Sequence, residues 1–401
     1  MRSGDPVRWI LAKVADRRDT RGRPFRLTAV IDSLESGGAE RIMALLTGAW
    51  VERGWNVELL LTLAGPNQKP FFEPDPRVRL RPLNLYRPSH GAADALANNL
   101  HRLRVIRAAI RSSRPDVVLS FMTETNVLTV LASLGLRKPV VVEEHIYSAW
   151  PPLRGSWQVL RLITYPLSAS VIALTPPALA TLGLARGRRG RVIPNPVMPP
   201  PPGRTVPSDP PVIVAIGRLV PQKGFDTILA AFAHVAPLHA DWRLEIWGEG
   251  PERAALEGLR DSLGLSDRVD FPGETRDPYE VLRRARLFVM SSRREGFPTV
   301  LGEAMACGLP VVSFDCPSGP RELIRNGIDG LLIPPNDIGG LAAGIDRLIT
   351  DRKLANDLAS RAPEVVDRFA LSTVLEQWDL VFADATGQAI GTGTRQSGKA
   401  S

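Results

Sequence analysis

Two glutamates in the second half of the chain have a spacing that could hold one elongated ligand. Glu295 follows a strand-like run at Leu287–Met290, and Glu303 lies in a segment from Pro298 to Ala306 that predicts a helix beginning at the proline. Glu303 would lie about five residues into this helix, roughly 7.5 Å along its axis at ~1.5 Å per residue. Carboxylates accept paired hydrogen bonds from vicinal diols such as those of ribose and hexoses. A solvated pair of helix glutamates would have the same spacing, so spacing alone leaves both interpretations open.

A glycine-containing loop with two cations precedes another predicted helix. The loop Gly217–Gly224 (GRLVPQKG) follows the strand-like run Val212–Ile216, and the helix begins near Phe225. Glycine after a strand lets the backbone approach a ligand closely, and a helix N-terminus adds free N–H groups and partial positive charge. Arg218 and Lys223 add two cations on what we expect to be an exposed loop, which suits a diphosphate. A surface loop with incidental basic residues is the alternative.

The elements that must position these residues alternate between strand and helix. Helical patterns run from Ala39 to about Arg53, after a glycine turn at Ser36–Gly38, and over Ala92–Arg111. Such alternation implies parallel sheets with crossover helices, and therefore two doubly wound, Rossmann-like α/β domains. The expected strands are Phe25–Ile31, Val57–Leu63, Asp116–Phe121, Pro139–Glu143, Ser170–Leu174, Val212–Ile216, Leu244–Trp247, Val269–Phe271, Leu287–Met290 and Val311–Phe314.

A proline-rich segment marks the domain boundary. Pro194–Pro211 contains nine prolines in 18 residues, which favours a semi-rigid linker over a strand. Two open α/β domains on one linker would face each other across a central cleft, where ligands of this architecture bind. We divide the chain into a basic leader at 1–23, an N-terminal domain at 24–195, a linker at 196–211, a C-terminal domain at 212–370, a C-terminal helix at 371–386 and a disordered tail at 387–401. The leader is interpreted as disordered, with a short interfacial helix as the alternative.

The charge is distributed unevenly. Residues 1–200 carry 28 basic and 15 acidic side chains, a net +13, whereas residues 201–401 carry 22 and 27, a net −5. A basic half suggests an anionic partner, although 44 of the 50 basic residues are arginine, which a GC-rich coding sequence would also explain. Within Ala92–Arg114, a possible basic face beside an apolar face could lie on anionic lipid. Its residues are Arg104, Arg107, Arg111 and Arg114. The alternative is an ordinary solvated helix face. No nucleic-acid-binding motif accompanies the charge, so nucleic acid is not an expected partner.

Composition excludes several other classes. The chain has 401 residues, 44% of them apolar, which suits two globular domains rather than disorder. Its longest largely apolar run, Val127–Leu136, is far below the roughly 20 residues of a membrane span. Two cysteines form no disulfide framework, and no signal peptide is recognisable, so a cytoplasmic setting is expected, with peripheral contact at the inner face of the membrane as an option. No Asp-x-Asp pair or His/Cys cluster occurs, so neither a metal nor another cofactor is expected.

Taken together, four motifs resemble the retaining nucleotide-sugar glycosyltransferases of the GT-B fold, in particular glycosyltransferase family 4. The resemblance covers most of residues 25–385. It rests on GGAER (37–41), IPNPV (193–197), GRLVPQKG (217–224) and EGFPTVLGEAMACGLPVV (295–312). A further segment, CPSGPRELI (316–324), resembles a subgroup that builds bacterial surface polysaccharides, often from galactose-type UDP-sugars.

The resemblance implies a role for each matching residue. It assigns Arg218 and Lys223 to the donor diphosphate, Glu303 to the ribose and Glu295 to the hydroxyls of the donor sugar. It also implies that His145 lies near the reacting carbon, whereas a histidine at a strand end is otherwise often a packed residue. Pro298 stands where many relatives have glycine, which removes one backbone donor. The expected catalytic residues are Arg218, Lys223, Glu295 and His145, and the expected donor-binding residues are Gly37, Gly38, Asn195, Gly217, Gly296, Phe297, Thr299 and Glu303.

The implied reaction is transfer of a hexose-type sugar from a UDP-sugar to a glycan or lipid-linked acceptor, with retention of configuration. The leaving phosphate can accept the proton of the acceptor, so no protein nucleophile is required. Hydrolysis by two carboxylates is rejected, because a cation pair fits a charged donor better. A nucleotide-sugar epimerase of the same fold and a non-catalytic sugar-binding protein remain as alternatives. Epimerases lack the EGFPTVLGE-type block, and an exported binding protein would need a signal peptide.

Overall fold

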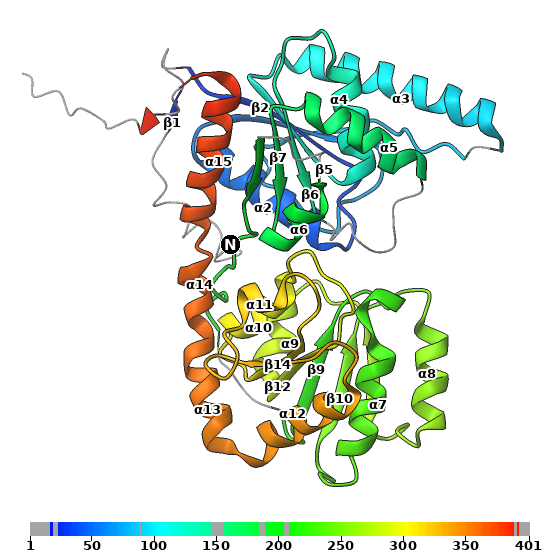
Figure 1. The fold of residues 1–401 in the computed structure, drawn as a ribbon, viewed down its shortest axis with the longest axis vertical. Helices are drawn as coiled ribbons and strands as arrows, with labels where there is room; N and C mark the ends of the chain where they lie inside the picture. The colour runs from blue at the N-terminus through cyan, green and yellow to red at the C-terminus, as the bar shows by residue number, and fades with distance from the viewer. Residues whose placement is uncertain are drawn as a thin grey trace, which may run out of the picture. The chain divides into compact units, whose positions relative to one another are not determined.

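The computed structural model describes residues 17–18, 23–88, 90–145, 155–183, 189–203, 208–388 and 391–392. They form two compact units, the first made of residues 1–194 and 372–401 and the second of residues 195–371 (Figure 1). The predicted disordered leader and tail fall mostly outside the described residues. The described residues of the leader and the tail include two short strands, β1 (Arg17–Arg18) and β15 (Gly391–Thr392), which pair antiparallel.

The first unit is built on a seven-stranded parallel sheet. In sheet order its strands are β4 (Arg79–Pro82), β3 (Asn56–Leu61), β2 (Arg26–Ile31), β5 (Val117–Phe121), β6 (Val140–Glu144), β7 (Ser170–Ala173) and β8 (Gly190–Val192). Its helices are α2 (Gly38–Glu52), α3 (Ala92–Ser113), α4 (Thr123–Ser133), α5 (Gly155–Thr164), α6 (Pro176–Thr181) and most of α15 (Leu371–Thr386), with a 3-10 turn, η1 (Tyr165–Leu167). The central strands β5 and β6 are buried along their whole length, as expected for strands of a parallel sheet that is covered on both faces.

The second unit has a six-stranded parallel sheet. Its strands, in sheet order, are β11 (Val269–Gly273), β10 (Arg243–Trp247), β9 (Val212–Ile216), β12 (Leu287–Met290), β13 (Val311–Phe314) and β14 (Leu331–Ile333). Its helical segments are η3 (Pro221–Lys223), α7 (Phe225–Val235), α8 (Arg253–Ser262), α9 (Pro278–Arg284), α10 (Thr299–Ala306), α11 (Pro320–Leu323), α12 (Ile338–Thr350), α13 (Arg352–Arg361), η4 (Ala362–Glu364) and α14 (Val365–Arg368). Strands β9 and β12 are parallel neighbours, with Leu287 opposite Ile213, so the loops that leave their carboxyl ends start at the same edge of the sheet.

The predicted fold class is confirmed, since each unit is a doubly wound parallel α/β domain. In the two parallel sheets, three strands were not predicted, namely β4, β8 and β14, and each lies at the edge of its sheet. Their sequences are RLRP, GRV and LLI, of three or four residues. Edge strands are short and partly solvated, so they lack the long apolar run that marks a central strand.

The chain returns to the first unit at its C-terminal end. Helix α15 packs an aromatic cluster against the first unit, in which Trp378 and Phe382 contact Trp50 at centroid distances of 6.1 and 5.6 Å. Asp379, from the same helix, forms a buried ion pair with Arg53 at 2.9 Å. Residues from Asn195 onward, which include the predicted linker, belong to the second unit.

Candidate active site

The glycine-containing loop and the glutamate loop meet through an ion pair. Lys223 Nζ donates to Glu295 Oε1 at 2.7 Å, and the two side chains are 22% and 8% exposed. The pairing follows from the topology, because β9 and β12 are parallel neighbours and both loops leave their carboxyl ends. Gly217 contributes by its missing side chain: a Cβ there would meet Lys223 Cδ and Cε at 3.4 Å, so the lysine stem runs across it.

The two cations of this loop have different environments. Arg218 is exposed as expected, whereas Lys223 is half-buried and already paired with a carboxylate. The expectation that both lie on an exposed loop is therefore wrong for Lys223. The reason is that η3 turns the chain before Gly224, whose φ of 64° lets α7 begin at once. The turn directs Lys223 back toward Glu295 rather than into solvent.

Glu303 lies on α10 and is 6% exposed. The helix begins one residue later than predicted, because Pro298 is its N-cap, in extended backbone with φ of −75° and ψ of 95°, and Thr299 is the first helical residue. The predicted end of the helix at Ala306 is correct. A glutamate that is almost fully buried disfavours the alternative of a solvated pair, since buried carboxylates need polar partners.

The loop between the two glutamates presents its backbone rather than its side chains. Phe297 is 6% exposed and packs edge-on against Phe369 at a centroid distance of 5.2 Å. Ser318 Oγ donates to the carbonyl of Gly296 at 3.1 Å. Thr299 opens α10, so its N–H belongs to the first turn, where backbone donors have no partner within the helix. This geometry is consistent with backbone recognition of a ligand.

In the first unit, Gly37 and Gly38 begin α2. Gly37 is the N-cap, and a Cβ at this position would collide with the carboxylate of Glu40. The acidic side chain thus folds back over the N-terminus of its own helix, where negative charge is favourable. Asn195, the first residue of the second unit, is 3% exposed.

His145 follows β6 and is turned into the unit. Its Nε2 lies 3.2 Å from Glu143 Oε1, with the imidazole 6% and the carboxylate 2% exposed. The ring of Phe121, at the end of the neighbouring strand, lies 4.4 Å away, centroid to centroid. These contacts are those of a packed histidine at a strand end. The prediction that His145 approaches the reacting carbon stays a prediction.

Sequence reasoning missed a set of buried polar side chains at the carboxyl ends of β2, β5 and β6. Glu144 accepts hydrogen bonds from Thr123 Oγ1 at 2.6 Å and Tyr165 Oη at 2.7 Å, and burial raises the pKa of its carboxyl. Asp32 accepts from the hydroxyls of Thr125 and Thr62, and burial likewise raises its pKa. Their position directly after predicted strands was the available signal. It was weak because each residue lacks a recognisable spacing with the others.

The described residues contain no group of three or more His, Cys, Asp or Glu side chains placed to hold a metal ion. Burial raises the pKa of both cysteine thiols, Cys307 and Cys316, to about 12, so neither is a ready nucleophile. In the part of the chain that the structure describes, every helix is too short or too polar to cross a bilayer.

One residue of the predicted basic face of α3 forms hydrogen bonds within the protein. Arg107 NH1 donates to the carbonyls of Ala132 and Leu134, at 2.9 and 2.6 Å, and so caps the end of α4. Arg104 and Arg111 are exposed. Contact with anionic lipid therefore stays a prediction, resting on fewer free charges than the sequence suggests.

Solved structures similar to this chain identify the fold class. Staphylococcus aureus TarM, solved with UDP, matches with a TM-score of 0.76 at 14% identity, over 89% of this chain and 99% of TarM. Anabaena HepE, solved with UDP and glucose, matches with a TM-score of 0.73 at 22% identity, over 90% of this chain and 99% of HepE. The two parallel-sheet units are those of a GT-B protein.

Two family models match the chain in its two halves. The model described as "Glycosyl transferase 4-like domain" matches residues 37–196, and "Glycosyl transferases group 1" matches residues 202–365. The chain belongs to the group 1 glycosyltransferases, family 4.

Curated relatives agree with this membership. A Campylobacter jejuni N-acetyl-D-galactosaminyltransferase, named for a PP-undecaprenol-linked acceptor, is 27% identical over 90% of this chain and 99% of the relative. The Rhizobium meliloti lipopolysaccharide core glycosyltransferase LpsE is 29% identical over 86% of this chain and 95% of LpsE. A Streptomyces coelicolor exopolysaccharide phosphotransferase is 35% identical over 70% of this chain, but the match spans only 30% of that protein.

Proposed function

We propose that this glycosyltransferase moves a hexose-type sugar from a UDP-sugar to a glycan or lipid-linked acceptor in cell-surface polysaccharide synthesis, with retention of configuration. The observation that carries the proposal is the Lys223–Glu295 pair at the carboxyl ends of β9 and β12. The direct contact of these groups at 2.7 Å places a cation for a phosphate and a carboxylate for sugar hydroxyls side by side, where both could reach one small ligand. The UDP complexes of TarM and HepE, and the names of the relatives, support the donor and the pathway class.

The proposed roles follow from the charge that develops during transfer. As the bond between the sugar C1 and the phosphate oxygen breaks, the sugar becomes cationic and the phosphate gains negative charge. Lys223 and the exposed Arg218 stabilise that phosphate. The acceptor oxygen bonds to C1 on the face that the phosphate leaves, and its proton passes to the phosphate oxygen. Glu295 binds sugar hydroxyls and Glu303 binds the ribose diol.

We expect transfer to proceed in excess EDTA, because protein cations replace the metal that would otherwise neutralise the diphosphate. The measurement is acceptor-dependent release of UDP from a panel of UDP-sugars, with candidate glycan and lipid-linked acceptors. Loss of activity in EDTA that Mn²⁺ or Mg²⁺ restores would contradict the assignment of Arg218 and Lys223. Interconversion of UDP-sugars without an acceptor would favour the epimerase.

Glu303→Ala is expected to raise the donor KM by about 10- to 100-fold, the equivalent of one hydrogen bond to a charged group. The ribose contact exists in both the ground state and the transition state, so KM should rise more than kcat falls. Steady-state kinetics with varied donor measures both. A folded variant with unchanged donor KM would place Glu303 outside the nucleoside pocket.

A further inference from the structure

We propose that the segment Cys316–Ile324 (CPSGPRELI) holds the donor loop Glu295–Pro298 in shape, with Ser318 and Gly319 as its positioning residues. The inference rests on the proposed function, because it assumes that this loop contacts the donor sugar. It gives a physical role to a motif that the donor contacts leave unexplained.

Ser318 fixes the loop by a hydrogen bond. Its side chain is completely buried, and its Oγ donates to the carbonyl of Gly296 at 3.1 Å. Gly296 directly follows Glu295, so this bond sets the orientation of the peptide group next to the carboxylate. Among the described residues, this is the hydrogen bond that the structure shows for the carbonyl of Gly296, so removal of the Ser318 hydroxyl leaves that carbonyl without its protein donor.

Gly319 fixes the loop by shape. Its φ of 100° belongs to the region that favours glycine. A Cβ at this position would lie 2.5 Å from Cδ of Pro298 and 3.3 Å from Cβ of Glu295. The ring of Pro298 thus occupies the space that the missing side chain leaves. A proline inside the donor loop and a glycine at position 319 are therefore complementary.

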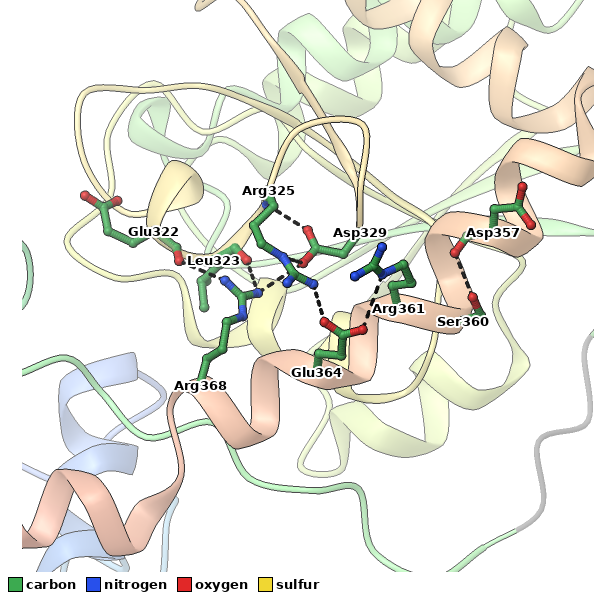
Figure 2. A network of polar contacts seen from close by, with 9 residues as sticks. All are labelled: Glu322, Leu323, Arg325, Asp329, Asp357, Ser360, Arg361, Glu364 and Arg368. Carbon is green, nitrogen blue, oxygen red and sulfur yellow. Dashed lines mark hydrogen bonds and ion pairs between the residues drawn. The ribbon is translucent and has the colours of Figure 1, made fainter.

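The positioning segment is itself anchored. Glu322 Oε2 accepts from the backbone N–H of Gly319 at 2.9 Å. At the other end of α11, Arg368 NH2 donates to the carbonyl of Leu323 at 2.5 Å and pairs with Asp329, which is fully buried. Figure 2 shows the contacts of Arg368 with Leu323 and Asp329, together with those of Arg325, which pairs with both Asp329 and Glu364 of η4. Because these contacts hold both ends of α11 in place, we expect the segment to resist displacement when the donor loop is perturbed.

The sugar-binding end of the donor site should depend on this support more than the nucleotide end. Glu295, beside Gly296, is proposed to bind the sugar, whereas Glu303 on α10 is proposed to bind the ribose. Displacement of the Glu295–Pro298 loop should therefore reduce the affinity for a UDP-sugar more than the affinity for UDP alone. The ratio of the two dissociation constants reports on loop position, and a general loss of stability would not change it.

The experiment compares Gly319→Ala with Pro298→Ala/Gly319→Ala and with the control Gly264→Ala. Gly264 also has positive φ, 69°, but nothing lies within 4 Å of its Cβ position, so the control carries a positive-φ strain without a collision. This strain is milder than at Gly319, whose φ and ψ are 100° and −63°, so the double variant, which keeps the strain of Gly319→Ala, isolates the collision. The probes are UDP and whichever of UDP-glucose, UDP-galactose and their N-acetylamino forms gives the largest thermal shift. Calorimetry measures both dissociation constants.

We expect Gly319→Ala to raise the ratio of the UDP-sugar constant to the UDP constant about tenfold, the equivalent of losing one polar contact. Pro298→Ala/Gly319→Ala should recover part of it, because the colliding Cδ is gone, and Gly264→Ala should leave it unchanged. If Gly319→Ala folds poorly, Ser318→Ala supplies the same measurement with no added atoms, with an expected rise of about threefold. An unchanged ratio in a folded Ser318→Ala or Gly319→Ala variant overturns the inference alone. Failure of the wild-type chain to bind UDP or any of the UDP-sugars overturns the proposed function first.

Discussion

Lys223→Ala is expected to lower kcat about 10²–10³-fold at saturating donor, the usual cost of removing one preorganised electrostatic partner of a transition state. Negative charge on the leaving diphosphate grows as the glycosidic bond stretches, so the ammonium binds the transition state more strongly than the ground state. The effect should therefore be larger on kcat than on donor affinity. Arg218→Ala should fall in the same range.

The ion pair with Glu295 sharpens this prediction. Without Lys223, a carboxylate whose side chain is 8% exposed loses its cation, so part of the loss comes from a displaced Glu295. Lys223→Ala and Glu295→Gln should therefore be non-additive, with the double variant less impaired than the product of the two single variants. Lys223→Arg should rescue activity only partly, because a planar guanidinium does not reproduce a compact ammonium.

Initial rates at saturating donor, with circular dichroism to verify the fold, measure these effects. A folded Lys223→Ala variant with near-normal kcat would show that the diphosphate is neutralised elsewhere. Strict additivity with Glu295→Gln would show that the ion pair separates before the reaction.

The central elements of both units were predictable because burial on both faces leaves a strong trace in the sequence. Val212–Ile216, Leu287–Met290 and Val311–Phe314 were predicted with their observed bounds. The short edge strands, such as Arg79–Pro82 and Gly190–Val192, were not, since pairing along one side only requires no apolar run. Apolar local sequence marks the central strands of a sheet, whereas an edge strand forms wherever a segment lies close enough to pair with the backbone of the neighbouring strand.

The candidate site was predictable as motifs and not as contacts. The two loops that carry Lys223 and Glu295 were predicted from glycine, proline and the strands before them. Their ion pair joins residues 72 positions apart, and it depends on β9 and β12 being neighbours in the sheet. The bond from Ser318 to Gly296 and the contact of His145 with Glu143 depend in the same way on packing. Spacing within one loop does not encode such partners.

The last prediction concerns helix α15, which was predicted as a helix but whose packing against the first unit could not be predicted from its sequence. Arg53 and Asp379 form an ion pair at 2.9 Å, with side chains 2% and 6% exposed. Removal of one partner leaves the other charge buried without its counter-ion, at a cost of about 3–5 kcal/mol. Asp379→Ala should therefore destabilise the first unit by that amount. For a unit of this size the melting temperature should fall by about 10 °C.

The same helix provides the matched control. Asp384 also pairs with an arginine of the first unit, Arg191, but the two side chains are 64% and 48% exposed. Solvent screens that pair, so Asp384→Ala should cost less than about 1 kcal/mol. Calorimetric unfolding of both variants, with limited proteolysis of the C-terminal helix, makes the comparison. Equal losses of stability would mean that burial of the Arg53 pair is not what holds the helix.

A double substitution separates the charge from the packing. In Arg53→Met/Asp379→Leu, apolar side chains of similar volume replace both ions, so no charge is left buried, and most of the stability lost in Asp379→Ala should return. The ring contacts that Trp50, Trp378 and Phe382 make with one another involve neither ion, so both substitutions leave these aromatic side chains in place. If the double variant is as unstable as Asp379→Ala, the ion pair itself, through its directed hydrogen bonds, fixes α15 on the first unit. If stability returns, the apolar contacts of the aromatic cluster stabilise the docking of α15, and the ion pair adds little to that stability.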